Sequence, residues 1–256
     1  MNDNSRKDIF FISHLFDLAE HAERYNYPVF TDFMTTKDLS LFIKNVPAFH
    51  NVHTMLWGGH PDCDHKMAGF FPMMIQADET MFPIACLQIK AVNVKYAGDI
   101  GHRDYLGAIL NLGIERSMIG DIRISDEAAY VFSNQEFVPF LLNELQLVRR
   151  TSVRCHVIKD INEIPPQEYQ ILQRSVASPR LDNVVSAMIG SSRGKASELI
   201  TQGKVMADYE ERNSNSYRCR DHTVVTIRGY GKFKLSMDNN NLTKKGKHKI
   251  TIYKYK

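Results

Sequence analysis

The chain has 256 residues, of which 43% are hydrophobic and 24% are charged. These values are typical of a folded globular protein and exclude a disordered chain, a collagen-like repeat and a coiled coil. No apolar run approaches the roughly 20 residues that span a bilayer, and the first residues lack the basic-then-apolar order of a signal peptide. We therefore expect a cytoplasmic protein of two or three modules, without a membrane partner.

The charge is distributed unevenly along the chain. Residues 180–256 contain 16 Lys and Arg against seven Asp and Glu, a net charge of +9, whereas residues 1–179 carry a net charge of −6. Because Lys and Arg release the counterions condensed on phosphates, a short basic module beside a mildly acidic body indicates a polyanion binder. Nucleic acid is the favoured partner, and a solvated basic tail or an anionic membrane surface is the alternative.

Residues 1–78 predict a small N-terminal α/β region. Apolar residues at helical spacing over 9–22 and 39–43 indicate two amphipathic helices. Weak alternation over 52–57 indicates a strand, which enters a tight turn at Gly58 and Gly59.

Residues 79–160 predict the order strand, helix, strand, strand, helix, strand. This order is that of the alpha-beta plait, the ferredoxin-like arrangement used by many RNA-recognition domains. The expected strands lie at 82–94, from Gly120, at 128–132 and at 153–158, and the expected helices lie at 102–112 and 137–148.

Residues 161–178 contain two adjacent prolines and several acidic residues, and they predict a linker. In residues 179–256, two short helices at 180–189 and 192–202 precede short strands. The tail from residue 239 is polar and then lysine-rich, and its last residues alternate as in a strand. The whole chain is therefore expected to be an α+β protein.

The first helices of this basic module carry a recognisable pattern. The stretch RLDNVVSAMIGSSRGKASELITQGKV begins at Arg180 and is followed by VVTIRG from Val224. It resembles the alpha-L RNA-binding motif, also called the S-four (S4) domain. The turn after its first strand reads Ala207-Asp208-Tyr209 where the family usually has a turn centred on asparagine, a departure that bears on the turn and not on the fold.

The physical chemistry of this segment suits RNA phosphate binding. Free backbone N–H groups and the helix dipole at the start of the second helix favour an anion, and basic side chains there add charge. We expect a further contact from the start of the predicted helix at residue 102. The predicted RNA-binding residues are Arg180, Ser192, Arg193, Lys195, Lys204, Arg228, Lys232, His102 and Arg103.

Two patterns could indicate catalysis or metal binding, and neither interpretation is favoured. The tripeptide Arg180-Leu181-Asp182 matches the surroundings of the catalytic aspartate of pseudouridine synthases, but here it belongs to the first helix of the RNA-binding module. His50, His53, His60, Cys63 and His65 cluster within 16 positions, yet they lack the tight recurrent spacing of a zinc module. We predict no catalytic residue, no metal and no cofactor, and we interpret the histidines as loop residues near an RNA surface.

The segment GHRDYLGAILNLGIERSMIGDI from Gly101, with Phe30-Thr31-Asp32-Phe33 and the turn Gly58-Gly59-His60-Pro61, resembles the YlmH family of bacterial RNA-binding proteins. The resemblance covers nearly the whole chain. It implies a plait followed by a C-terminal S4 domain, and a non-catalytic factor that binds large-subunit ribosomal RNA and peptidyl-tRNA in quality control of stalled translation. It also implies an association with cell division.

Two alternatives from other classes remain open. An RNA-modifying enzyme, related to pseudouridine synthases or with a catalytic centre within residues 50–105, would leave a modified nucleoside as its product. An adaptor of the division apparatus would localise to the septum independently of ribosomes. No small-molecule substrate is expected in the favoured interpretation.

Overall fold

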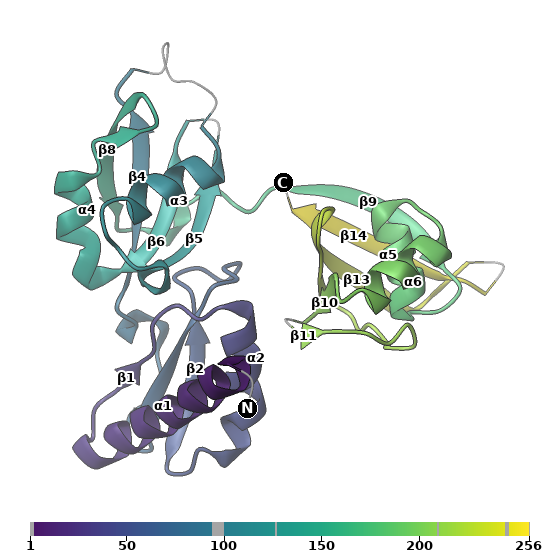
Figure 1. Cartoon of the computed structure of the whole chain (residues 1–256), viewed down its shortest axis with the longest axis horizontal. Helices are drawn as coiled ribbons and strands as arrows, with labels where there is room; N and C mark the ends of the chain where they lie inside the picture. The colour runs from purple at the N-terminus through teal and green to yellow at the C-terminus, as the bar shows by residue number, and fades with distance from the viewer. Residues whose placement is uncertain (1–2, 94–99, 126, 209, 244–245, 256) are drawn as a thin grey trace. The chain divides into compact units, whose positions relative to one another are not determined.

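The computed structural model describes residues 3–93, 100–125, 127–208, 210–243 and 246–255. The chain forms two compact units, residues 1–166 and 167–256 (Figure 1). Both units combine helices with antiparallel sheets, so the predicted α+β class is confirmed. No helix in the described ranges is long and apolar enough to cross a membrane.

The N-terminal region packs two helices on a three-stranded antiparallel sheet of order β1-β3-β2. A capping box joins Thr35 and Asp38 at the start of the second helix, and this explains why that helix begins there. The strand β3 was not predicted, because all six of its residues are buried and no polar alternation marks it. The elements are α1 (Asp3–Tyr25), β1 (Val29–Phe30), α2 (Thr36–Asn45), β2 (Val52–Trp57) and β3 (Met67–Pro72).

The predicted plait is confirmed by the second sheet, which is antiparallel with strand order β5-β6-β4-β8-β7. The helix expected at 137–148 ends at Glu144, because Leu147 and Val148 pair with the following strand instead. Val94, the last residue of the first expected strand, lies outside the described residues. The elements are β4 (Ile84–Ala91), α3 (His102–Leu110), β5 (Ile119–Ile124), β6 (Ala129–Asn134), α4 (Val138–Glu144), β7 (Leu147–Val148) and β8 (Thr151–Ile158).

Apolar residues cover both faces of the plait's sheet. Ile109 of α3 and Leu141 of α4 pack on one face. On the other face, Phe132 of β6 lies in a core shared with Phe33 and Phe71 of the N-terminal region. RNA-recognition motifs stack bases on aromatic residues of an open sheet. Here the N-terminal region covers the centre of the corresponding face, so residues 1–166 do not present an open platform at that point.

The turn at Gly59 fixes how the N-terminal region meets the plait. Its φ of +92° lies in the left-handed region, and a Cβ there would lie 2.5 Å from Cδ1 of Phe132. We expect Gly59→Ala to lower the free energy of unfolding by about 2 kcal/mol, because it adds backbone strain and a steric overlap. Urea unfolding followed by the fluorescence of Trp57, the only tryptophan, measures this change.

Gly107 provides the matched control for this substitution. It lies inside α3, and a Cβ there would meet nothing within 4 Å. Gly107→Ala should therefore raise the free energy of unfolding by roughly 0.5–1 kcal/mol, as expected for a helix interior with room for the added methyl group. Equal losses at the two positions would contradict the assigned role of Gly59.

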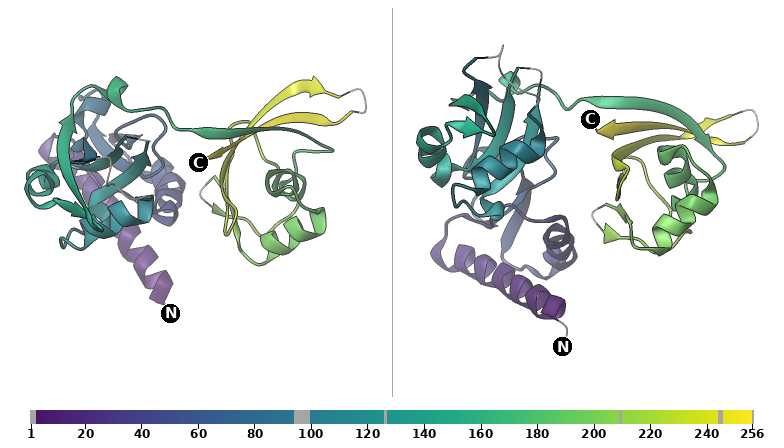
Figure 2. Two further views of the ribbon diagram at one scale, coloured as in Figure 1. Left: turned by 90° about the horizontal axis from the view of Figure 1, so that it is seen from above. Right: turned by 45° about the horizontal axis from the view of Figure 1, so that its top comes forward.

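The C-terminal unit has a six-stranded antiparallel sheet of order β11-β10-β12-β13-β14-β9. Its two helices, α5 and α6, lie on one side of that sheet (Figure 2). Val184, Leu199, Phe233 and Ile252 belong to the core between helices and sheet. The elements are β9 (Tyr169–Val176), α5 (Leu181–Ile189), α6 (Arg193–Thr201), β10 (Val205–Ala207), β11 (Glu210–Glu211), β12 (Val224–Ile227), β13 (Gly231–Leu242) and β14 (His248–Tyr255).

The prediction of a linker throughout 161–178 is wrong for residues 169–176. These residues form β9, which pairs along its whole length with β14. The sequence does not predict this strand, because apolar and polar residues alternate only weakly along it and its partner strand lies more than 70 positions later in the chain. The strand pattern at the end of the tail is confirmed by β14, whereas Lys244, Lys245 and Lys256 lie outside the described residues, as does Tyr209. The predicted domain boundaries at residues 78, 160 and 178 stay predictions.

Candidate nucleic-acid interface

A buried carboxylate organises two of the predicted RNA-binding arginines. The Asp182 side chain is 5% exposed, and it accepts hydrogen bonds from Nε of Arg180 at 3.2 Å and from Nη2 of Arg193 at 2.5 Å. Burial opposes ionisation of this carboxyl, but the hydrogen bonds and charges of the two arginines outweigh burial and hold its pKa below the ordinary value. The Arg193 side chain is 62% exposed, so Asp182 fixes a guanidinium that remains accessible to a ligand.

The start of α6 has the predicted anion-binding geometry. Ser192 is the N-cap, and its hydroxyl accepts a hydrogen bond from the backbone N–H of Lys195. The Lys195 ammonium lies 2.9 Å from the Glu198 carboxylate, and this hydrogen bond is the main reason that the pKa of Lys195 is raised. Lys195 therefore stays charged, in an exposed ion pair that a phosphate can replace at small cost.

Lys204 and Arg228 extend this basic surface past the other end of α6. The backbone N–H of Arg228 donates to the carbonyl of Lys204 at 2.9 Å, so the two residues are adjacent although they are 24 positions apart. Both are exposed. We call the group of Arg180, Ser192, Arg193, Lys195, Lys204 and Arg228 the α6 surface.

Lys232 does not belong to the α6 surface. It lies on β13 between Gly231 and the buried Phe233, and it therefore faces away from the helices. Its ammonium lies 4.7 Å from the ring centroid of Tyr255 on β14. The nine residues predicted as one RNA-binding set thus fall on distinct surfaces.

Arg174 is a candidate RNA contact that sequence reasoning missed. It pairs in register with Ile250, which is buried under the helices, so it faces the helix side of the sheet. A cavity of about 330 Å³ is lined by Arg174, Arg193, Ser186 and Ser191 among others. Because Arg174 was assigned to a linker, nothing in the sequence marked it as a neighbour of Arg193.

His102 and Arg103 lie in the first compact unit, at the start of α3. Both have solvent-exposed side chains, although the His102 ring is partly enclosed, and the helix begins with a hydrogen bond from the Gly101 N–H to the Asp104 carboxylate. Partial burial, followed by the charge of Arg116, lowers the pKa of His102 from its ordinary value of 6.5. His102 is therefore neutral at pH 7 and can offer a phosphate a hydrogen bond, while Arg103 supplies the charge.

The loop histidines join the loop after β2 to the plait. Asp121 of β5 lies 2.5 Å from Nδ1 of His65, and the backbone N–H groups of Asp64 and His65 also donate to it. Arg123 donates to Nδ1 of His60 at 2.9 Å. These contacts give His60 and His65 a packing role that the sequence alone did not indicate.

No set of three or more His, Cys, Asp or Glu side chains in the described part of the chain could hold a metal ion. Burial and then the neighbouring Asp121 raise the pKa of the Cys63 thiol, so this thiol stays protonated near neutral pH. A protonated thiol is a poor metal ligand.

The lowered pKa values of two histidines predict how the free energy of unfolding of the first unit depends on pH. Burial followed by the charge of Arg123 lowers the pKa of His60, and His102 shifts in the same direction. These two histidines therefore bind protons less readily in the folded state than in the unfolded chain. Protonation below about pH 6.5 consequently favours the unfolded state. We expect the free energy of unfolding, measured by Trp57 fluorescence in urea, to decrease from pH 6.5 to 5.5.

A His60→Asn/His102→Asn variant removes both titrating groups and should give a flatter profile over the same range. An unchanged slope in the double variant would show that other groups carry the pH dependence.

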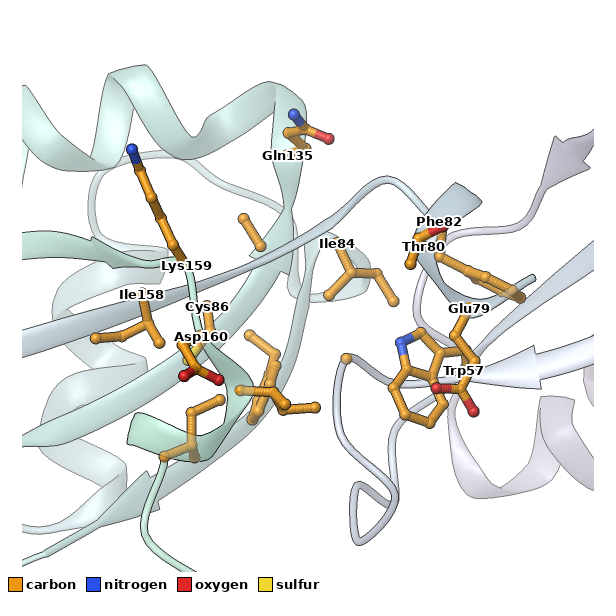
Figure 3. Close-up of a pocket in the computed structure, with 15 residues that line it drawn as sticks. Trp57, Glu79, Thr80, Phe82, Ile84, Cys86, Gln135, Ile158, Lys159 and Asp160 are labelled. Carbon is orange, nitrogen blue, oxygen red and sulfur yellow. The ribbon is translucent and has the colours of Figure 1, made fainter.

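A cavity of about 590 Å³ lies in the first unit (Figure 3). Trp57, Phe82 and Ile158 contribute to its apolar wall. Of the charged side chains that line it, Lys159 is basic and Glu79 and Asp160 are acidic. This balance does not favour a polyanion, so the cavity is not part of the candidate interface.

The domain composition agrees with this geometry. The family model described as the putative RNA-binding domain in YlmH matches residues 78–162, and the S4 domain model matches residues 179–225. The chain is therefore an RNA-binding protein that combines these two domains, and the resemblance to the YlmH family is confirmed.

This chain is similar to two known proteins over most of the length of each. The chain is 29% identical over 231 residues to the ribosome-associated protein quality control protein P2 of Bacillus subtilis (strain 168), covering 88% of this chain and 87% of that protein. It also resembles the solved structure of the cell division protein YlmH from Streptococcus pneumoniae, with a TM-score of 0.51 and 22% identity, over 64% of this chain and 97% of that one. The second likeness concerns the fold alone.

Proposed function

We propose that this protein binds the large ribosomal subunit and peptidyl-tRNA and acts, without catalysing a reaction, in quality control of stalled translation. The observation that carries the proposal is the α6 surface, in which a buried Asp182 fixes exposed arginines beside the N-terminus of α6. Fixed guanidinium groups and free helix N–H groups are suited to RNA phosphates. The similarity to a ribosome-associated quality control protein supports the ribosome as the particular partner.

The environment of Asp182 supports a non-catalytic role. Its two carboxylate oxygens are occupied by Arg180 and Arg193, and one of them also accepts from the backbone N–H of Asn183. A nucleophile must reach its substrate, whereas this carboxylate lies at the base of an ion-pair network. The place of action that follows from this proposal is the cytoplasm.

Sedimentation of the tagged protein from cells with stalled translation tests this proposal. On a sucrose gradient, the protein should move with free large subunits that carry tRNA, and higher salt should release it, because phosphate contacts exchange with counterions. A protein that stays at the top of the gradient at both salt concentrations would overturn the proposal. Loss of one modified nucleoside from the RNA of a deletion strain would favour an RNA-modifying enzyme instead.

A further inference from the structure

We propose that the C-terminal sheet has a second RNA-binding surface, a platform on which bases of single-stranded RNA stack, on the face opposite to α5 and α6. The proposal rests on the proposed function only in taking RNA as the partner. It concerns a different face of the unit, made of different strands and different chemistry from the α6 surface.

Three tyrosines form the aromatic part of this face. Tyr169 of β9 lies between Tyr253 and Tyr255 of β14, with ring centroids 5.6 and 5.0 Å away. The register confirms their common side. Tyr169 pairs with Tyr255, and Ile252, which precedes Tyr253 on β14, is buried under the helices, so Tyr253 and Tyr255 face the other way. Ile171 is 60% exposed and adds an apolar surface beside Tyr253.

Lysines surround the aromatic cluster. Lys234 pairs with Tyr253 across β13 and β14, so it lies on the same face, and Lys232 lies over the ring of Tyr255. Lys249 follows the same alternation on β14 and is exposed. We call these lysines and the three tyrosines the tyrosine face. On β12, β9, β14 and residues 231–237 of β13, the described side chains on this face include no carboxylate.

This combination of groups fits single-stranded RNA better than an RNA duplex. A duplex hides its bases and offers mainly phosphates and sugars, which the α6 surface suits. Bases of a single strand can stack on aromatic rings, while flanking lysines follow the backbone charge. The plait's sheet cannot serve in this way at its centre, because Phe132 and the residues around it are covered by the N-terminal region.

The whole tyrosine face lies outside the segment that matches the S4 domain. The S4 match ends at residue 225, whereas β13, β14 and β9 supply all three tyrosines and all three lysines. Strand β9 comes from the segment predicted as a linker, and β14 comes from the tail. The two strands form the platform together, since they pair over eight residues.

Binding of two labelled RNAs to the full chain tests the proposal. The first probe is a ten-nucleotide oligouridine, which stays single-stranded, and the second is an RNA hairpin with a fully paired stem closed by a stable, structured tetraloop. In fluorescence anisotropy, Tyr253→Ala and Tyr255→Ala should each weaken oligouridine binding about tenfold, since a base loses its stacking partner. The hairpin should bind each variant within about twofold of the unmodified protein.

Tyr253→Phe and Tyr255→Phe are the matched controls. Phenylalanine keeps the stacking ring and loses only the hydroxyl, so these variants should bind oligouridine within about twofold of the unmodified protein. An alanine variant that binds as well as the unmodified protein, or a phenylalanine variant that loses as much as alanine, would overturn the proposal.

Two further measurements separate this proposal from the proposed function. Photocrosslinking of 4-thiouridine oligomers to the unmodified protein should label peptides of β9, β13 or β14, and labels confined to the helices α5 and α6 would overturn the platform. The Arg193→Gln/Lys195→Gln variant should lose hairpin binding and keep oligouridine binding. If oligouridine binding needs the tyrosines but the protein never sediments with ribosomes, the platform stands and the ribosomal function fails.

Discussion

Reversal of charge at both Arg193 and Lys195 is expected to release the protein from large ribosomal subunits. The double variant Arg193→Glu/Lys195→Glu replaces two phosphate-binding cations by anions beside the N-terminus of α6. We expect RNA affinity to fall roughly 10- to 100-fold at physiological salt, and the slope of log affinity against log salt concentration to fall by about 2. Co-sedimentation at two salt concentrations measures both quantities.

A control must change the net charge equally at a different place. Arg6→Glu/Lys7→Glu on α1 reverses two basic residues in the first unit, and it should leave co-sedimentation within about twofold. Because Arg193→Glu brings a carboxylate toward Asp182, the neutral variant Arg193→Gln/Lys195→Gln is needed as well. Full ribosome binding by that neutral variant, in a folded protein, would contradict the role of the α6 surface.

Removal of the buried carboxylate should destabilise the C-terminal unit. Asp182→Ala deletes the acceptor of four hydrogen bonds, two from Arg180 and one each from Arg193 and the backbone of Asn183. Because hydrogen bonds to a charged group each contribute more than neutral ones, we expect the free energy of unfolding to fall by about 3 kcal/mol. Hydrogen exchange of the amides in 181–201 reports this loss for the two helices directly.

A double-mutant cycle assigns the loss to the ion pair. Asp182→Ala should cost less in an Arg193→Gln background than in the unmodified protein, because one partner has already been removed. Asp182→Asn should be milder than Asp182→Ala, since the amide oxygen still accepts a hydrogen bond. A stable Asp182→Asn protein whose cells lack one RNA modification would instead favour catalysis by Asp182.

The sequence predicted the local features of the RNA-binding module well. Ser192 caps α6 as expected, and Asp182 lies in the first turn of α5. These features depend on residues one to four positions apart, and such short-range signals are visible in a sequence. The plait could also be predicted, because its helices and most of its strands carry a regular apolar period.

Features that depend on distant residues could not be predicted. Arg174 joins the cavity beside Arg193 only because β9 pairs with β14. Lys232 belongs to the tyrosine face and not to the α6 surface, and this depends on the strand register and not on spacing from the helices. His65 is bound by Asp121, 56 positions away. In each case a tertiary contact that no local pattern marks decides the role of the side chain.

The position of β14 between β13 and β9 has a consequence for biosynthesis. Tyr255 pairs with Tyr169, 86 positions earlier, and β14 is the only neighbour of β9 among the described strands. The first unit can complete its folding while the ribosome is still translating the second, but β9 can pair only after β14 has been synthesised. A nascent chain that stops before His248 therefore lacks the completed sheet, and only chains that include β14 acquire both of the proposed RNA-binding surfaces.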